Sequence, residues 1–244
     1  MTFLIRKSTD ADLASVIQWL KEEHEKCATG FFCNRDVITA AHSNKEMIVL
    51  VINGSPVAFL ANGLGRDGIL EVRKDRRGRG YGKALAEEGL RQAIADDDVC
   101  VLDIQCAPSS SIPFWEGMGF TIYSGDYASR NLPRTLALPA AGKDVELEIR
   151  EHLDPAQHYP ETSIATQFIK PHARRGEDGN IYLEERIIFG RSTSFRDMVA
   201  RIIVDGEDRF FNKLKYDEAA ECGVCRDKYG NFYIDCIYVR SSSK

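Results

Sequence analysis

Hydrophobic and polar residues alternate along the first half of the chain in two different periods, which predict strands and helices in turn. Short apolar runs predict β-strands at residues 3–6, 47–52, 57–61, 69–72, 99–104 and 120–123. Apolar residues three and four positions apart predict a helix capped by Thr9 or Asp10, and further helices near 37–41, 85–94 and 113–118. Asn53-Gly54 predicts a tight hairpin between two strands. This order indicates a mixed α/β fold, with a sheet flanked by helices.

The second half of the chain has a different pattern, made mainly of strands and turns. The segment 138–143 contains proline, glycine and small residues and is the best linker candidate. Beyond it, Asp205-Gly206 predicts a hairpin between strands at 198–204 and 209–214. A short helix at 216–221, a last strand at 232–239 and an exposed loop at 172–180 complete the prediction. We therefore expect two domains, residues 1–139 and a smaller β-rich domain at 144–244.

Composition and charge narrow the class of protein. With 43% hydrophobic and 28% charged residues, the chain is typical of a globular protein. Its net charge of −5 gives no overall field that favours nucleic acid or anionic lipid, so we expect neither as a partner. No apolar run approaches the roughly 18 residues that span a bilayer. The seven cysteines are scattered, which favours a reducing, cytoplasmic location over a disulfide framework.

One loop stands out from this acidic background. Between a predicted strand and a predicted helix, residues 73–83 contain six cations, one acid and three glycines. Glycine lets the backbone approach a bulky anion, and the start of a helix presents free N–H groups and the positive end of its dipole. Arginine adds charge-assisted hydrogen bonds to phosphate oxygens. The loop therefore predicts a cradle for a diphosphate.

The letters of the loop exclude two common kinds of phosphate site. A Walker A loop needs glycine at Arg77 and serine or threonine at Ala84. A dinucleotide fingerprint needs glycine at Lys83. The pattern that fits is R-x-x-G-x-G, from Arg77 to Gly82. The plainer alternatives for the loop are a solvated basic turn and a nucleic-acid patch, and the acid surplus of the chain weakens the second.

This motif resembles that of the GNAT superfamily of acyl-CoA N-acyltransferases, in which a strand, a basic turn, R-G-x-G-x-G and a helix follow one another. A second segment, Pro113–Phe120, is similar to the aromatic and Gly-Phe segment of that family. The resemblance covers about residues 4–138 and departs from the family at Lys74, where proline is frequent. It implies a mixed, mostly antiparallel sheet flanked by helices, and acetyl-CoA as co-substrate without a metal. The cofactor-binding residues that it implies are Leu70, Val72, Arg73, Arg77, Gly78, Arg79, Gly80, Tyr81, Gly82, Lys83, Phe114 and Trp115.

The resemblance implies that a primary amine of a small molecule or protein accepts the acyl group. An alkyl amine with a pKa of about 10.4 is neutral at pH 7 in only about one molecule in 2,500. A carboxylate, usually acting through water, removes the proton as the amine attacks. Glu71 is the first candidate base, and a partner for nearby arginines is its alternative role. Glu22, Glu23 and water held by backbone carbonyls are weaker candidates.

The departing thiolate raises a second question about chemistry. Many members of the family protonate it with a tyrosine at the position of Trp115, but an indole N–H does not act as an acid at neutral pH. Tyr123 and Tyr127 are candidate substitutes, with ordinary strand tyrosines as the alternative. A thiolate with a pKa near 8.5, by analogy to cysteine, leaves readily without help. By the same resemblance, Phe31 and Phe32 border the acceptor site, although core packing explains them equally well.

The C-terminal half resembles no family that we recognise. Cys222 and Cys225 form a C-x-x-C with Cys236 downstream, but no second pair of ligands suggests zinc, and the histidines 152, 158 and 172 lack metal spacing. This half covers the acceptor site, mediates formation of a homodimer or binds a protein partner, and the sequence does not separate these roles. For the whole chain, the alternatives to an N-acyltransferase are a non-catalytic acyl-CoA sensor and an acylating toxin.

Overall fold

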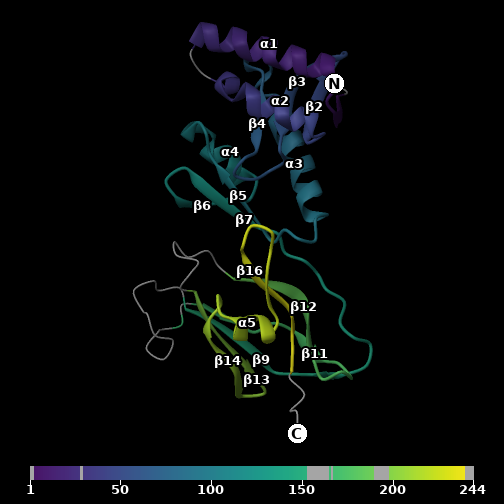
Figure 1. The fold of residues 1–244 in the computed structure, drawn as a ribbon, viewed down its shortest axis with the longest axis vertical. Coiled ribbons are helices and arrows are strands. Elements are labelled where there is room, and N and C mark those ends of the chain that lie inside the picture. Colours follow the sequence, from purple (N-terminus) through teal and green to yellow (C-terminus); the bar gives the residue numbers. More distant parts are fainter. Residues whose placement is uncertain (1–2, 28–29, 153–164, 166, 190–197, 240–244) are drawn as a thin grey trace. The chain divides into compact units, whose positions relative to one another are not determined.

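The structure is a computed structural model that describes residues 3–27, 30–152, 165, 167–189 and 198–239 (Figure 1). Its chain contacts form two compact units. The first comprises Met1–Asp97 and Leu102–Arg130, and the second comprises Asp98–Val101 and Asn131–Lys244. His158, one of the histidines considered above, lies outside the described residues.

A four-stranded antiparallel sheet organises the first unit. Its strands, in spatial order, are β1 (Leu4–Lys7), β2 (Met47–Ile52), β3 (Ser55–Ala61) and β4 (Ile69–Val72). The predicted Asn53-Gly54 turn joins β2 to β3, with φ angles of 49° and 81° that fit a type I′ hairpin. Because side chains alternate along a strand, odd-numbered residues of β2, β3 and β4 face one side of the sheet and even-numbered residues face the other.

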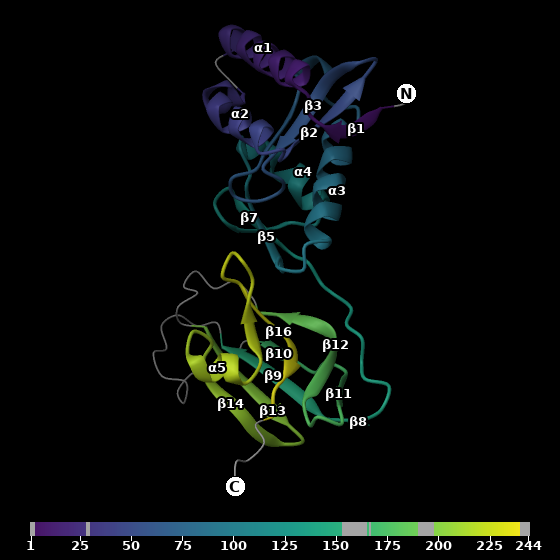
Figure 2. The same ribbon diagram turned by 45° about the vertical axis from the view of Figure 1, so that its right-hand side comes forward.

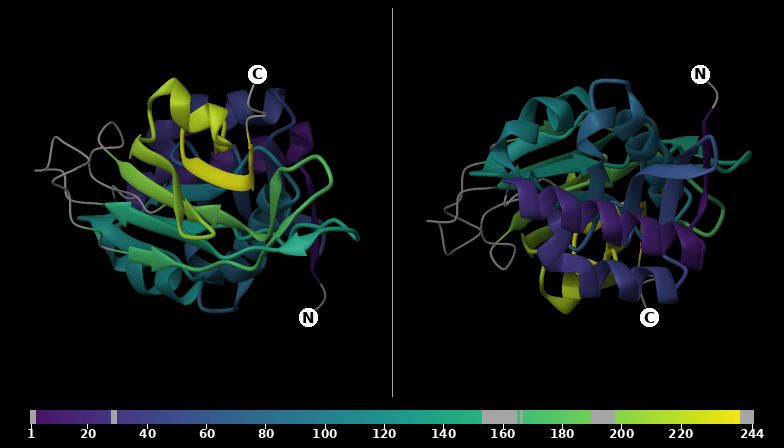
Figure 3. Two further views of the ribbon diagram at one scale, coloured as in Figure 1. Left: turned by 90° about the horizontal axis from the view of Figure 1, so that it is seen from below. Right: turned by 90° about the horizontal axis from the view of Figure 1, so that it is seen from above.

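Helices cover both faces of this sheet. On one face, α1 (Asp10–Cys27) and α2 (Arg35–Ser43) lie side by side and are joined through the 3₁₀ turn η1 (Phe31–Asn34) (Figure 3, right). Their apolar residues form one core with the odd-numbered strand residues, which include Val16, Trp19, Leu20, Ile38, Met47, Val49 and Phe59. On the other face, α3 (Tyr81–Ile94) packs so closely that a Cβ at Gly89 would lie 2.8 Å from Leu60 and from Leu64 (Figure 2).

A capping box fixes the start of α1. The Asp12 carboxylate accepts a hydrogen bond from the Thr9 N–H at 2.8 Å, and Thr9 Oγ1 accepts one from the Asp12 N–H at 3.3 Å. Arg6 of β1 forms an ion pair with the same carboxylate. Burial acts to raise the pKa of Asp12, but the bonds from Arg6 and Thr9 outweigh it and leave that pKa below its ordinary value. Thr9 is therefore the cap of this helix.

A second, separate sheet lies in the first unit except for its residues Val101 and Asn131. Its strands are β5 (Val101–Gln105), β6 (Thr121–Ser124) and β7 (Tyr127–Asn131), in the order β5-β7-β6. The 3₁₀ turn η3 (Ser109–Ser111) and α4 (Ile112–Gly117) connect β5 to β6. In the part of the chain that the structure describes, no strand pairs with β4 on the side away from β3. The two sheets are therefore separated at β4.

The second unit is built from two sheets and one short helix, α5 (Asp217–Glu221). One sheet has the order β10-β9-β13-β14 and the other β15-β16-β12-β11-β8. Both sheets contribute to a single apolar core, with Ile149 and Ile202 from one and Ile181 and Ile234 from the other. The strands are β8 (Lys143–Asp144), β9 (Leu147–His152), β10 (Gln167–Ile169), β11 (Ala173–Arg175), β12 (Ile181–Ile188), β13 (Val199–Val204), β14 (Glu207–Lys213), β15 (Val224–Arg226) and β16 (Phe232–Ile237).

The structure confirms the mixed α/β class with a β-rich C-terminal half, and it corrects one local prediction. The segment 172–180 is not an exposed loop throughout, because β11 pairs there with β12 and β8. Ala173 is only 1% exposed, and the charges that suggested a loop are paired: Arg174 with Asp144, and Arg175 with Asp205. Paired charged side chains on a short strand therefore gave this segment the composition of a loop.

We expect Thr9→Ala to lower the free energy of unfolding of the first unit by about 1 kcal/mol, because it removes the side-chain cap of α1. Urea titration followed by tryptophan fluorescence measures this unit specifically, since both tryptophans of the chain, Trp19 and Trp115, lie in it. Thr39→Ala is the matched control, because the Thr39 hydroxyl bonds only its own helix at Arg35. Equal midpoints for the two variants would contradict the assigned cap.

Candidate active site

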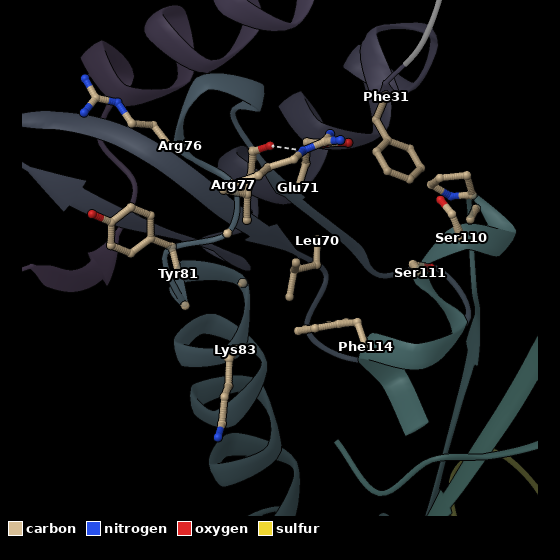
Figure 4. Close-up of a pocket in the computed structure, with 16 residues that line it drawn as sticks. Phe31, Leu70, Glu71, Arg76, Arg77, Tyr81, Lys83, Ser110, Ser111 and Phe114 are labelled. Carbon is tan, nitrogen blue, oxygen red and sulfur yellow. Dashed lines mark hydrogen bonds and ion pairs between the residues drawn. The ribbon is translucent and has the colours of Figure 1, made fainter. Parts of the chain in front are cut away.

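A pocket of about 400 Å³ lies beside β4 in the first unit (Figure 4). Its walls come from β4, from the loop that follows it, from the first turn of α3 and from the segment that leads into α4. The lining residues are Phe31, Leu70, Glu71, Val72, Arg76, Arg77, Gly78, Gly80, Tyr81, Gly82, Lys83, Ala107, Pro108, Ser110, Ser111 and Phe114.

The glycine-rich loop forms one end of this pocket. After the 3₁₀ turn η2 (Lys74–Arg76), Gly78 and Gly80 adopt φ angles of 72° and 82°, a left-handed conformation that favours glycine. Helix α3 begins immediately afterwards, and no side chain caps it. The first N–H groups of a helix have no acceptor within it, so the start of α3 presents backbone donors to the pocket.

Gly82 allows α3 to approach β4 closely. A Cβ built on this residue would lie 3.3 Å from Val72 Cγ2, and 3.9 Å from atoms of Leu70 and Phe114. The contacts also show that the side chains of Leu70 and Val72 point toward α3. By alternation, the side chain of Glu71 points to the opposite face of the sheet, where α1 and α2 lie.

Glu71 is a buried carboxylate with a cationic partner. It is 6% exposed and forms an ion pair with Arg77, as the dashed line in Figure 4 shows. Burial raises the pKa of the Glu71 carboxyl, the Arg77 charge acts to lower it, and the charge of Glu23 acts to raise it; the net result is a pKa above the ordinary value of glutamate. The geometry therefore allows Glu71 either of the two roles predicted from the sequence, a base or an ion-pair partner of arginine.

The backbone of β4 offers donors on its second edge. The Arg73 N–H donates to the carbonyl oxygen of Val57 at 2.9 Å, toward β3. Because N–H and C=O groups alternate in direction along a strand, the N–H groups of Leu70 and Val72 turn to the opposite edge. The Val72 carbonyl agrees with this direction, since Arg77 Nε donates to it from that side at 3.0 Å.

Comparison with known proteins identifies the unit that contains this pocket. The family model of the acetyltransferase (GNAT) family matches residues 13–120. Residues 13–120 form a GNAT acetyltransferase domain. No protein of curated function matches the chain in a sequence comparison.

Solved structures similar to the GNAT domain come from several bacteria. An N-acetyltransferase from Staphylococcus aureus Mu50 is 18% identical, with 54% of this chain and 99% of that chain covered and a TM-score of 0.42. A GNAT family acetyltransferase from Brucella melitensis in complex with acetyl-CoA is 18% identical, with 53% and 88% covered and a TM-score of 0.43. N-acetylglutamate synthase from Neisseria gonorrhoeae, complexed with coenzyme A and N-acetyl-glutamate, is 16% identical, with 54% and 35% covered and a TM-score of 0.42.

Most residues predicted for cofactor binding meet in the pocket of the GNAT domain, but four predicted site residues do not line it. Arg73 is held by Asp75 through bonds of 2.7 and 3.0 Å. Arg79 lies outside the lining, and Trp115 lines a smaller neighbouring pocket. Tyr123, the candidate acid, is 36% exposed on β6, with its ring 6.4 Å from that of Tyr127.

The residues predicted to lie near the acceptor site or to act as a weaker base also divide into those that line the pocket and those that do not. Phe31 lines the pocket, whereas Phe32 contacts the His24 ring at a centroid distance of 5.7 Å. Glu23 Oε1 accepts a hydrogen bond from the Lys74 N–H at 2.8 Å, which ties α1 to the basic loop. Glu22 is exposed and accepts a bond from Gln18 within its own helix.

Several residues of the pocket were absent from the set predicted from the sequence. Arg76 is one of the six cations of the loop, but the motif does not predict it as a site residue. Ala107, Pro108, Ser110 and Ser111 reach the pocket only because the chain between β5 and α4 folds beside β4. Small residues in a connection have no periodicity and no distinctive chemistry. The sequence therefore gives no signal for them, and only the tertiary structure places them in the pocket.

The cysteines and histidines considered from the sequence form no metal site among the described residues. All seven cysteines are free thiols, and burial raises the pKa of Cys222 to about 11. Within the same residues, no three or more metal-binding side chains gather into a group that could hold an ion. No described helix combines the length and the apolar character needed to cross a membrane.

We expect Gly82→Asp to weaken coenzyme A binding at least about tenfold, because a carboxylate beside a bound diphosphate is a repulsive juxtaposition of like charges. The added Cβ requires only a small shift of Val72. Isothermal titration with coenzyme A measures the change. Gly117→Asp is the matched control, because a Cβ there meets nothing within 4 Å and the residue lies outside the pocket. Unchanged affinity in Gly82→Asp would overturn the placement of the diphosphate.

Proposed function

We propose that the protein is an N-acyltransferase that moves an acetyl group from acetyl-CoA to a primary amine of a small molecule or protein. The amine attacks the thioester directly in a ternary complex. One observation supports this function above the others: a single pocket joins a cationic, glycine-rich helix start to a buried carboxylate and to a strand edge that no described strand occupies. These are the groups that hold a diphosphate, accept a proton and bind a thioester carbonyl.

In this proposal, the diphosphate of the co-substrate binds where residues 77–83 enter α3. The exposed Arg79 and the half-buried Arg73 add positive charge from outside the pocket lining. The pantetheine arm follows β4, beside Phe114 and Trp115. The acetyl-CoA and coenzyme A complexes of the similar bacterial proteins support the choice of co-substrate.

Transfer then needs a base and a polarised carbonyl. The N–H groups of Leu70 and Val72 turn to the edge of β4 where the thioester would lie, so they are the proposed oxyanion-type donors. Glu71 accepts the amine proton, directly or through water, while the C–N bond forms and the C–S bond breaks. Its raised pKa makes it a stronger base than an exposed glutamate.

The proposal needs no acid at Tyr123. That hydroxyl belongs to a half-exposed residue outside the pocket lining. Coenzyme A departs as a thiolate whose pKa, near 8.5 by analogy to cysteine, lets it leave without prior protonation. The role of Tyr123 as the acid is therefore the weakest part of the predicted site.

A non-catalytic acyl-CoA sensor is the second candidate function, and one observation favours it. The carboxylate of Glu71 is already engaged by Arg77, as in a purely structural ion pair. A sensor would bind acyl-CoA and release no thiol with any amine. A thiol-release assay over a panel of amines therefore separates the two functions.

We further propose that residues 1–139 act as the acyltransferase domain and residues 144–244 as an accessory domain. The support is that the whole pocket lies between residues 31 and 114, while the strands of 143–237 share a core of their own. The accessory domain has three candidate roles: a cover for the acceptor, a homodimer contact or a surface for a protein partner.

We expect Glu71→Gln to reduce kcat on the best amine of the panel by about 100-fold, the lower end of what a general base contributes. Coenzyme A affinity should change far less, because the substitution leaves the cations of the loop and the start of α3 in place. Glu25→Gln, an exposed carboxylate on α1, is the matched control. Turnover of Glu71→Gln at the rate of the wild type would remove Glu71 from the mechanism.

The pH profile tests the same residue independently. A base works only when deprotonated, so the rate contributed by Glu71 falls as pH drops through its pKa, and burial places this fall above the ordinary glutamate value of 4.5. Ionisation of the amine affects both proteins equally. We therefore expect the ratio of wild-type to Glu71→Gln kcat/KM to decline toward low pH, with a midpoint above 4.5. A ratio independent of pH would count against Glu71 as the base.

A further inference from the structure

The sheet β10-β9-β13-β14 of the second unit has one face in the apolar core and a second face that points away from it (Figure 2). Ile149 of β9 and Ile202 of β13 belong to the core. Because side chains alternate along a strand, their neighbours Arg150 and Arg201 point to the opposite side. Both arginine side chains are about one-third exposed. We call this side of the sheet the outer face.

One row of the outer face joins two aromatic rings through two arginines. The strand registers place four residues side by side, one from each strand, in the order Phe168, Arg150, Arg201 and Phe211. The Arg150 guanidinium lies over the Phe168 ring, 5.5 Å from its centroid. The Arg201 guanidinium lies over the Phe211 ring in the same way, at 5.2 Å. Phe168 is still 61% exposed, so most of its ring is open to a partner.

A second row, two residues further along the strands, has the opposite balance of charge. Register places Glu148, Ile203 and Asp208 side by side, and Lys170 Nζ lies 3.8 Å from a carboxylate oxygen of Glu148. Within one chain, each arginine of the first row already forms an ion pair with an acid of the second row. The first row therefore contains two cations and no acid, whereas the second contains two acids and one cation.

Two such rows on one face are complementary to a second copy of the same face. A two-fold axis that lies between the rows, perpendicular to the strands, places the first row of one copy over the second row of its partner. Arg150 then faces the partner's Glu148, and the Phe168 ring faces the ammonium group of the partner's Lys170. Opposite charges and a cation over an aromatic ring both attract. Symmetry repeats each contact, so each contributes twice.

We propose that the outer face is the contact between two copies of this chain, which form a homodimer through the second unit. Aromatic and arginine side chains are the types enriched at protein interfaces. A nucleic acid fits this face less well, because Glu148 and Asp208 lie beside the two arginines and repel phosphate. Of the three candidate roles of the accessory domain, this contact gives it that of a homodimer contact. The dimer needs no ligand in the GNAT domain, so its test is independent of the proposed function.

Sedimentation velocity of the full chain measures the association at concentrations up to about 100 µM, where a contact of micromolar affinity is populated. The wild type should approach twice the mass of one chain. Phe168→Ala should raise the dimer dissociation constant at least about tenfold, because both copies lose a ring from the interface. Tyr229→Ala removes a ring of similar exposure, 59%, outside the outer face and is the matched control. A wild type that stays monomeric, or an equal loss in both variants, would overturn the inference.

An exchange of charge tests how the two rows are paired. Arg150→Glu sets like charges against the partner's Glu148 and should weaken the dimer at least about tenfold. Combined with Glu148→Arg, it restores opposite charges both within and between the copies, so the double variant should recover the dimer. Arg91→Glu reverses an arginine that has its own ion pair on α3, and it is the matched control. A dimer that tolerates Arg150→Glu, or that the double variant fails to recover, would overturn this arrangement.

Discussion

Strand β4 has one edge paired with β3 and a second edge that no described strand occupies, and the proposed site is built along that second edge. In the four residues of β4, both the backbone N–H groups and the side chains alternate in direction. Backbone alternation sends the N–H groups of Leu70 and Val72 to the unpaired edge. Side-chain alternation sends Leu70 and Val72 toward α3 and Glu71 toward α1 and α2. One short strand thus offers amide donors and a carboxylate in different directions.

Charge in the site is set locally and not by the whole chain. A net charge of −5 repels an anion at long range, but the cations of residues 73–83 lie within one loop, beside the start of a helix. Arg77 connects the two functions of the pocket, since it contacts both the Glu71 carboxylate and the Val72 carbonyl. In the proposed mechanism, phosphate oxygens compete for this guanidinium. Any weakening of the ion pair would remove a charge that lowers the pKa of Glu71, so binding of the donor would strengthen the base.

The sequence predicted those features of the fold and the site whose pattern lies in consecutive residues. β2 and β4 match their predicted bounds because a buried strand is a local apolar run, and the cradle was found because its cations and glycines are consecutive. Ser111 and Ala107 were missed because they join the site only when the β5–α4 connection folds beside β4. The prediction of a loop at residues 173–175 is wrong because a short strand with paired arginines has the composition of a turn. Local patterns predict elements and motifs, whereas the wall of a pocket depends on packing.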